Sequence, residues 1–316
     1  MNKQEFYDEV IKEMKEQIPE PFKEHVEIDV REINKTNDDK KMSVSIRLSP
    51  SGIAPMLYLD DFYEEYQDGE SVEDIASHIL CMAAEAGVHA PDFESQSMAY
   101  EDIADKLTMQ MVEGERNKDR LQNLVYSPID NGMVMIPYIE LGRDEGGCYR
   151  APVTKEMACD LDYDVEKLLD QAFENLVAKN EPALYEMGFF DDKPPTRNPM
   201  CEDFEINPYH GMYILTNNRK DEGASVLFYP GMDTRIGELL GSNYFALPGS
   251  LHEFIIVPDN GLHDAQQFRQ IVKEANATII PPNEVLSDRV LYFDREKNKL
   301  YEPKGRERNS DERGDR

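Results

Sequence analysis

Apolar residues in the first third of the chain recur at the spacing of one helical face in three places. This period predicts helices over residues 2–18, 71–86 and 100–112. Ser71 opens the second of these with the Ser-x-x-Asp spacing of a capping box, and Gly87 suits its C-terminal cap.

Between the first two predicted helices, apolar and polar residues alternate over residues 26–30 and 42–48. That period of two predicts a pair of strands, joined by the polar loop 34–41. Each strand has one apolar face, so we expect the hairpin to lie with that face against a helix.

The rest of the chain mixes short strand patterns with helical ones. It lacks the regular strand–helix alternation of a doubly wound sheet, which predicts an α+β fold with mixed or antiparallel sheets and flanking helices. Predicted strands are 133–141, 148–153, 212–216, 224–229, 244–247, 253–257, 290–293 and 299–301, and predicted helices are 164–179, 233–240 and 262–275.

A polar stretch at residues 113–120 is the best candidate for a boundary between two lobes. We therefore expect an acidic N-terminal α+β lobe over 1–120 and a C-terminal α+β lobe over 121–303. Residues 304–316 have mixed charge and no large apolar residue, which predicts a disordered tail.

The composition changes the picture through its charge. The 316 residues have a formal net charge of −30, with 64 acidic against 34 basic side chains. A chain this acidic repels nucleic-acid phosphates and anionic membrane surfaces, so we expect no direct binding to either.

Several classes of protein are disfavoured by what the sequence lacks. The four cysteines form no CxxC pair and are expected to be free thiols, mostly in the core. The N-terminal residues lack a signal-peptide pattern and no apolar run has membrane-spanning length, which predicts a cytoplasmic protein. No P-loop, GxGxxG, HExxH, EF-hand or GxSxG pattern occurs, so no cofactor is expected.

One stretch of the first lobe is much more one-sided than the rest. The 58 residues from 48 to 105 contain no Lys or Arg but fourteen carboxylates. A surface under no functional pressure usually intersperses both signs. We interpret the densest part as a candidate binding surface for a basic partner, made of Asp60, Asp61, Glu64, Glu65, Asp68, Glu70, Glu73 and Asp74.

Three interpretations of this stretch stay open. It is a solvated acidic face neutralised by cations from elsewhere in the fold, a docking surface for a basic protein, or a mimic of DNA phosphates. The sequence favours a non-enzymatic interaction or regulatory protein, with a DNA-mimic inhibitor as the first alternative. It does not predict an oligomeric state.

An enzyme is the second alternative, because Ser250, His252 and Glu253 place a hydroxyl, an imidazole and a carboxylate within four residues. In an extended segment Ser250 and His252 point to the same side, as a hydrolase-like pair requires. A capping serine and a structural histidine are the commoner explanation. His252, His263 and Asp264 are weak candidates for a metal site.

The region 212–292 resembles a family of unknown function. The matching segments are 213–217, 223–224, 229–231, 239–241, 244–253, 276–278 and 284–288. The family comprises acidic cytoplasmic proteins of Gram-positive, largely gut-dwelling bacteria, often encoded near mobile genetic elements, and the resemblance implies no assigned activity. Family members usually have a second serine where Gly249 stands, so this chain departs from the pattern there.

Overall fold

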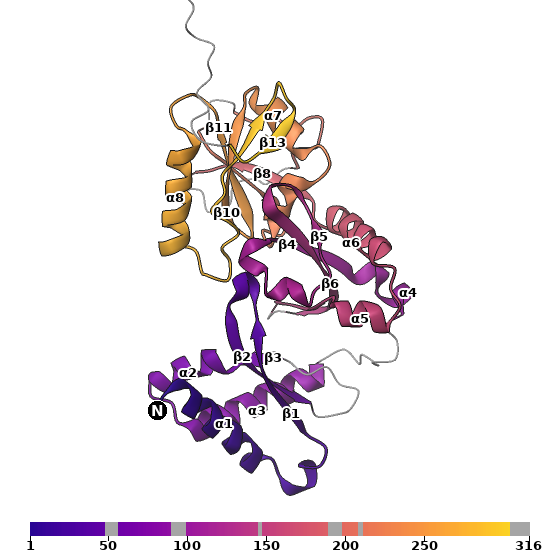
Figure 1. Ribbon diagram of the computed structural model, residues 1–316, viewed down its shortest axis with the longest axis vertical. Coiled ribbons are helices and arrows are strands. Elements are labelled where there is room, and N and C mark those ends of the chain that lie inside the picture. The colour runs from indigo at the N-terminus through magenta and orange to yellow at the C-terminus, as the bar shows by residue number, and fades with distance from the viewer. Residues whose placement is uncertain (48–55, 90–98, 145–146, 189–197, 208–210, 304–316) are drawn as a thin grey trace, which may run out of the picture. The chain divides into compact units, whose positions relative to one another are not determined.

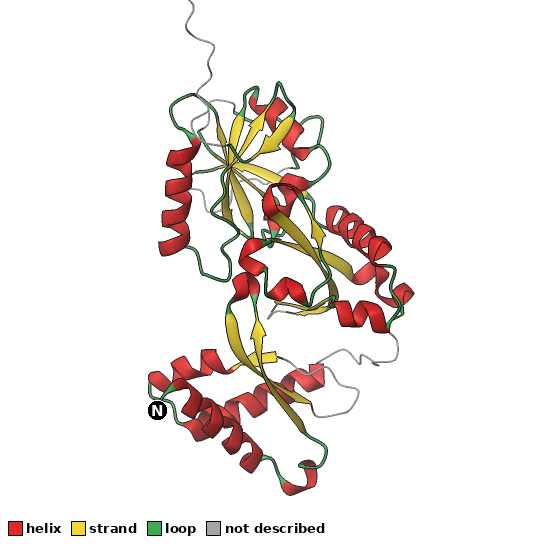
Figure 2. Cartoon of the chain, in the orientation of Figure 1, coloured by secondary structure: helices red, strands yellow, loops and turns green. Residues whose placement is uncertain are grey.

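The computed structural model divides the chain into two compact units, each with its own sheets and helices (Figures 1 and 2). Unit 1 comprises residues 1–103 and 141–149, and unit 2 comprises residues 104–140 and 150–316. The structure describes residues 1–47, 56–89, 99–144, 147–188, 198–207 and 211–303, without the side chains of 86–89 and 143–149. The predicted disordered tail, 304–316, lies outside the described residues.

Unit 1 consists of an antiparallel sheet and the helices that pack on it. The strand order is β1-β2-β3, and the β1–β2 hairpin runs in continuous register from Glu27↔Arg47 to Asn34↔Lys40. The elements are α1 (Lys3–Gln17), β1 (Glu27–Asn34), β2 (Lys40–Arg47), β3 (Met56–Tyr58), α2 (Leu59–Gln67), α3 (Val72–His89) and α4 (Tyr100–Ile103).

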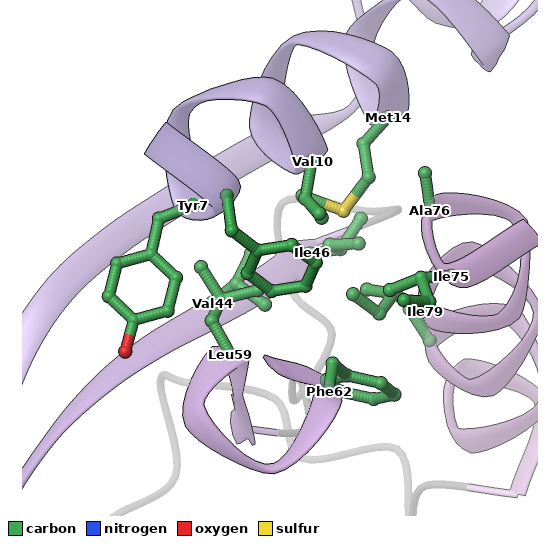
Figure 3. Close-up of a cluster of buried hydrophobic side chains, with 12 residues drawn as sticks. Tyr7, Val10, Met14, Val44, Ile46, Leu59, Phe62, Ile75, Ala76 and Ile79 are labelled. Atoms are coloured by element: carbon green, nitrogen blue, oxygen red, sulfur yellow. The ribbon is translucent and has the colours of Figure 1, made fainter. Parts of the chain in front are cut away.

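The core of unit 1 forms where α1, α2 and α3 meet the inner face of β2 (Figure 3). Phe6, Val10 and Met14 of α1 contribute one side, and Ile75, Ala76 and Ile79 of α3 contribute the other. Val44 and Ile46 alternate with polar residues along β2, so both point into this cluster. The predicted hairpin and its packing on helices are confirmed.

Unit 2 contains two antiparallel sheets. The first has the order β4-β6-β5, with β7 also paired to β6, and helix α6 packs on β4. Asn175 of α6 fixes this contact by donating to the carbonyls of Ala104 and Leu107, at 2.7 and 2.9 Å. The elements are β4 (Leu107–Glu113), β5 (Ser127–Pro128), β6 (Met133–Asp144), β7 (Gly147–Pro152), α5 (Lys155–Asp160) and α6 (Val165–Lys179), and the division assigns the end of β6 and the start of β7, within 141–149, to unit 1.

The second sheet of unit 2 has six strands in the order β13-β12-β10-β11-β9-β8. Phe245 on one face of β10 packs against Phe268 of α8, with ring centroids 5.0 Å apart. Tyr244 points the other way, stacks on Phe293 and donates to the Asp233 carbonyl of α7. The elements are β8 (Pro182–Glu186), β9 (Tyr213–Asn217), α7 (Met232–Leu240), β10 (Tyr244–Ser250), β11 (Glu253–Pro258), α8 (Ala265–Thr278), β12 (Leu291–Asp294) and β13 (Lys299–Tyr301).

The α+β class with antiparallel sheets is confirmed, but three local predictions are wrong. Residues 107–113 form strand β4 instead of continuing a helix, and all seven are buried. Apolar and polar residues do alternate over 107–111, but Ile103, Leu107 and Met111 are also four positions apart, as on one face of a helix, and this second pattern led to the helical prediction. Gly87 does not end α3, which continues to His89.

The third wrong prediction is the strand at 224–229, where the chain forms a 3₁₀ helix, η7 (Gly223–Phe228). Its first five residues are buried, and a short run that is apolar on every side has no diagnostic period. The expectation of core cysteines also fails, because Cys81, Cys159 and Cys201 are exposed.

The polar stretch 113–120 lies inside unit 2 in this division of the chain. It contains the end of β4 and a 3₁₀ turn at Glu115–Asn117. Asn117 is fully buried and donates to the carbonyl of Glu113 at 2.9 Å, which fixes the turn.

The approach of η7 to β9 depends on Gly223. A Cβ there would lie 2.2 Å from Thr216 Oγ1, 2.6 Å from the Asn217 nitrogen and 2.7 Å from the His252 carbonyl oxygen. Two of these neighbours are backbone atoms held in the sheet and its turn, so they have little freedom to move away.

We predict that Gly223→Ala lowers the free energy of unfolding by roughly 1–3 kcal/mol or more, as overpacking does. Thermal and urea unfolding followed by circular dichroism measure the loss. Gly211→Ala is the control, since a Cβ at Gly211 meets nothing within 4 Å. Equal stability of the two variants would contradict the close packing at Gly223.

Candidate functional site

Residues 59–89 of the acidic stretch form helices α2 and α3 and the turn between them. Its densest part is the corner between the two helices, where Glu64, Asp68, Glu70, Glu73 and Asp74 are all exposed. We call these five residues the acidic corner. In the part of the chain that the structure describes, no Lys, Arg or His approaches any of them within 4 Å, although the Ser71 hydroxyl donates to Asp74 at 2.6 Å.

Two neighbouring carboxylates do have a basic side chain nearby. Lys41 of β2 lies 3.6 Å from Asp61, and His78 of α3 lies 3.7 Å from Glu65. All four side chains are exposed or half-buried, so these pairs contribute little to stability. The predicted surface therefore has a lysine and a histidine at its edge, whereas no basic side chain of the described residues lies within 4 Å of the corner.

Asp60 is the exception among the predicted partner-binding residues. Its side chain is only 7% exposed, pairs with Lys3 at 2.5 Å and accepts the Met42 N–H at 2.7 Å. Burial acts to raise the pKa of Asp60, but Lys3 and the Met42 amide outweigh it, and the pKa is lowered overall. Asp60 therefore joins α1, α2 and β2 and is not available to a partner.

The Ser250–His252–Glu253 candidate occupies the tight turn between β10 and β11. Ser250 pairs with Glu253 across the turn, and its hydroxyl donates to Glu253 Oε1 at 2.9 Å while accepting the His252 N–H at 3.0 Å. The expected extended geometry is wrong, because residues 251 and 252 form the turn itself. Ser250 is 5% exposed and both its bonds are structural, so the geometry does not support a nucleophile.

His252 lies close to groups that no sequence pattern associates with it. The Glu222 N–H donates to its Nδ1 at 3.0 Å, while Asp221 lies 3.5 Å from Nδ1 and Glu284 lies 3.7 Å from Nε2. The amide favours the neutral ring, but the carboxylates favour the imidazolium. The Asp221 carboxylate, opposed by burial and aided by Glu284 and Glu253, raises the pKa of His252.

The metal candidates do not come together as a ligand set. Asp264 is the N-cap of α8, where it accepts the Gln267 N–H at 2.9 Å. The His263 ring packs against Phe268, with centroids 5.4 Å apart. Among the described residues, no group of three or more His, Cys, Asp or Glu side chains has an arrangement that could hold a metal ion.

A buried ionic network in unit 2 is the feature that sequence reasoning missed. Arg150 of β7 makes a two-pronged ion pair with Glu222, which also accepts from Gln110 of β4. Arg150 also lies over the Tyr138 ring, 4.6 Å from its centroid. Burial opposes the charged guanidinium, yet the Glu222 carboxylate outweighs it and raises the pKa of Arg150.

Glu222 is thus held from two directions. Its side chain is bound by Arg150, its amide bonds His252, and its backbone is left-handed, with φ 51°. A charged residue within the apolar run of β7 is the one sequence signal for this network. The partner lies 72 positions away, which no local pattern reveals.

Comparison with known families decides the membership of the chain. The pattern that defines a family of unknown function, DUF5688, matches residues 3–295. The chain belongs to DUF5688. The match extends over both units, and it includes the region 212–292.

DUF5688 membership supports the resemblance seen in the sequence but adds no activity, host or genetic context. No curated protein and no solved structure matches the chain. Within the described residues, none of the helices has the length and apolar character needed to cross a bilayer.

Asp60 and Asp61 are adjacent, but the first is buried and the second is exposed, so the same substitution at each position provides a test and its control. We predict that Asp60→Asn lowers the free energy of unfolding by roughly 1–3 kcal/mol, because the Lys3 ammonium and the Met42 N–H lose the charged acceptor that the buried Asp60 side chain provides. Asp61→Asn, with a side chain 65% exposed, should leave the melting temperature unchanged.

The difference in stability between the two variants should become smaller as the pH falls. The lowered pKa of Asp60 means that its stabilisation is present above its ordinary pKa of about 3.9 and is lost as the pH falls through the folded value. Unfolding measured at several pH values checks this. A gap between the variants that persists at the lowest pH would refute the ionised pair.

The raised pKa of His252 gives the opposite sign. Its stabilisation is complete below the ordinary histidine pKa of about 6.5 and disappears as the pH rises through the folded value. His252→Asn keeps an acceptor for the Glu222 amide but does not titrate. We predict that its deficit in melting temperature is largest near about pH 5.5 and shrinks by about pH 8.5. A deficit that grows with pH would show that the hydrogen bond from the Glu222 N–H, which requires the neutral ring, outweighs the attraction of the carboxylates for the imidazolium.

Proposed function

We propose that the protein is a non-enzymatic interaction protein that docks a basic protein partner through the acidic corner of unit 1. The observation on which this depends is that all five carboxylates of the corner are exposed, with no cationic side chain within 4 Å among the described residues. We further propose that it acts in the cytoplasm, as the family resemblance implies.

Helix electrostatics explains only part of the corner. Glu73 and Asp74 lie in the first turn of α3, where the helix dipole favours negative charge. Glu64 and Asp68 lie at the C-terminal end of α2, where the dipole disfavours it. These two are also four positions apart, a spacing at which like charges repel by a few tenths of a kcal/mol.

The corner thus contains charges that destabilise the isolated fold. A partner rich in Lys and Arg removes that repulsion and pairs the carboxylates at once. The resulting field also speeds encounter, and this effect weakens as ionic strength rises. Such a surface favours a partner with a cluster of basic residues over one with an apolar groove.

The test compares two variants that each remove four negative charges. The corner variant is Glu64→Gln/Asp68→Asn/Glu70→Gln/Glu73→Gln, and the control is Glu156→Gln/Glu166→Gln/Asp170→Asn/Glu174→Gln on α5 and α6 of unit 2. Asp74 is retained because Ser71 donates to it at the start of α3. A fluorescent lysine-rich peptide is titrated into each, and anisotropy reports binding.

We predict that the corner variant binds at least about tenfold more weakly than wild type at low salt, and the control much less so. Equal weakening in the two variants would mean that net charge alone attracts the peptide, and the docking proposal fails. Proteins captured by the wild type but not by the corner variant are then challenged with duplex DNA. Their release would favour the DNA-mimic alternative.

A further inference from the structure

One edge of the unit 1 sheet is formed by strand β1. It has eight residues, and β2 is the only strand of the described residues that pairs with it. An edge strand offers a row of backbone N–H and C=O groups to any further strand. Folded proteins usually keep such edges short or cover them, so an edge of this length is a candidate interaction surface.

Two hydrogen bonds show which backbone groups of β1 point away from β2. In the first, the Met42 N–H donates to Asp60 at 2.7 Å. Asp60 comes just after β3, which pairs with β2 on the side opposite β1. Glu32 lies opposite Met42 in the β1–β2 register. Because the Met42 amide points away from Glu32, this pair is not hydrogen-bonded, and the N–H and C=O of Glu32 also point outward.

The second hydrogen bond agrees with the first. The carbonyl of Arg31 accepts from the Ser43 hydroxyl at 2.9 Å, so this group points to β2. Successive residues of an antiparallel strand turn their backbone groups to alternate sides. The outward groups are therefore those of Ile28, Val30 and Glu32, and within the described residues no hydrogen bond occupies them.

The side chains of β1 also leave this edge accessible. Asp29 and Arg31 lie on the solvent face, each with a side chain 60% exposed, and they form only a weak exposed pair with each other at 3.5 Å. On the other face, Ile28 and Val30 pack against the unit 1 core but are only partly buried. The edge thus combines two opposite charges that have room for further partners with apolar surface that is still open to water.

Pairing with a second copy of β1 is self-complementary in one register. An antiparallel pair centred on Val30 places Asp29 opposite the partner's Arg31, and Arg31 opposite the partner's Asp29. These are non-hydrogen-bonded positions, where opposite side chains approach most closely. Moving the centre by one residue places Asp29 or Arg31 opposite its own copy, and moving it by two places carboxylates opposite each other. Charge therefore selects a twofold-symmetric pair centred on Val30.

We propose that β1 is a self-association surface, through which two copies of the chain form an antiparallel strand pair centred on Val30. The pair forms about six backbone hydrogen bonds, from Ile28, Val30 and Glu32 of each copy, and two ion pairs. It also covers the apolar surface of Ile28 and Val30 that unit 1 leaves open. The contact is small, so the dimer is weak and depends on protein concentration. This proposal is independent of the docking proposed for the acidic corner.

Sedimentation equilibrium of the full-length protein at about 5–500 µM measures the dimer, in about 0.15 M salt so that the general repulsion between two acidic chains is screened. Asp29→Arg and Arg31→Asp each place like charges opposite one another and should weaken dimerisation at least about tenfold. Asp29→Arg also reduces the net negative charge, so general repulsion alone predicts stronger association. Glu16→Arg is the matched control, since it makes the same charge change at an exposed position of α1.

Mixing the two charge variants gives a sharper result. An Asp29→Arg chain and an Arg31→Asp chain have opposite charges at both facing positions, so an equimolar mixture should dimerise about as tightly as wild type although neither variant does so alone. Val30→Pro removes the outward N–H at the centre of the pair and should also weaken the dimer at least about tenfold. Proline is tolerated on edge strands, so this variant keeps the test decisive if a charge variant fails to fold, which circular dichroism reports.

A wild type that stays monomeric over this concentration range overturns the proposal. Dimerisation that all three β1 variants leave unchanged also overturns it, because the contact then lies elsewhere on the chain. A mixture of folded charge variants that stays monomeric overturns the register centred on Val30, because Asp29 and Arg31 then do not face each other in the dimer.

Discussion

Apolar burial between three helices and strand β2 holds together a unit whose surface charges repel one another. The cluster formed by α1, α2, α3 and β2 excludes water from a dozen side chains, and this is the main force that opposes the repulsion. The ion pair between exposed Lys3 and buried Asp60 adds a directional contact between α1 and α2. The acidic corner exists because this core is strong enough to tolerate it.

Unit 2 contains carboxylates that are turned inward and paired with arginines. Its acidic residues Glu113 and Glu222 are drawn inward, and each is bonded by arginines from other strands or loops. Such pairs cost desolvation energy and are tolerated only with good geometry and full hydrogen bonding. In unit 2, these paired ions connect strands β4 and β7 of the first sheet to the segments around Glu222 and Arg289 beside the second sheet.

Local patterns were sufficient for most of the fold. The helix predicted at 2–18 is α1 with Asn2 as its cap, and the Ser71 capping interaction opens α3 as its spacing indicated. They failed at 107–113, where apolar residues spaced four apart also fit a helical face, and at 224–229, where a short buried run has no diagnostic period.

The candidate site was predictable only to the extent that it is local. The absence of Lys and Arg from 48–105 is visible in the sequence, and it identified the corner. The burial of Asp60 depends on Lys3 and Met42, and the surroundings of His252 depend on Asp221 and Glu284. Those partners meet only after the chain folds, so spacing gave no sign of them.

The contact between Glu113 and Arg289 spans 176 positions, and it has a consequence for how the protein is made. On the ribosome, every buried residue of the α1–α3 core has been synthesised once the chain reaches Ala83, so unit 1 can form its helices early. Strand β4 must wait for nearly the whole polypeptide before its buried carboxylate finds a guanidinium. During synthesis, unit 2 is thus the part that exposes apolar surface for longer, because its distant pairings form late.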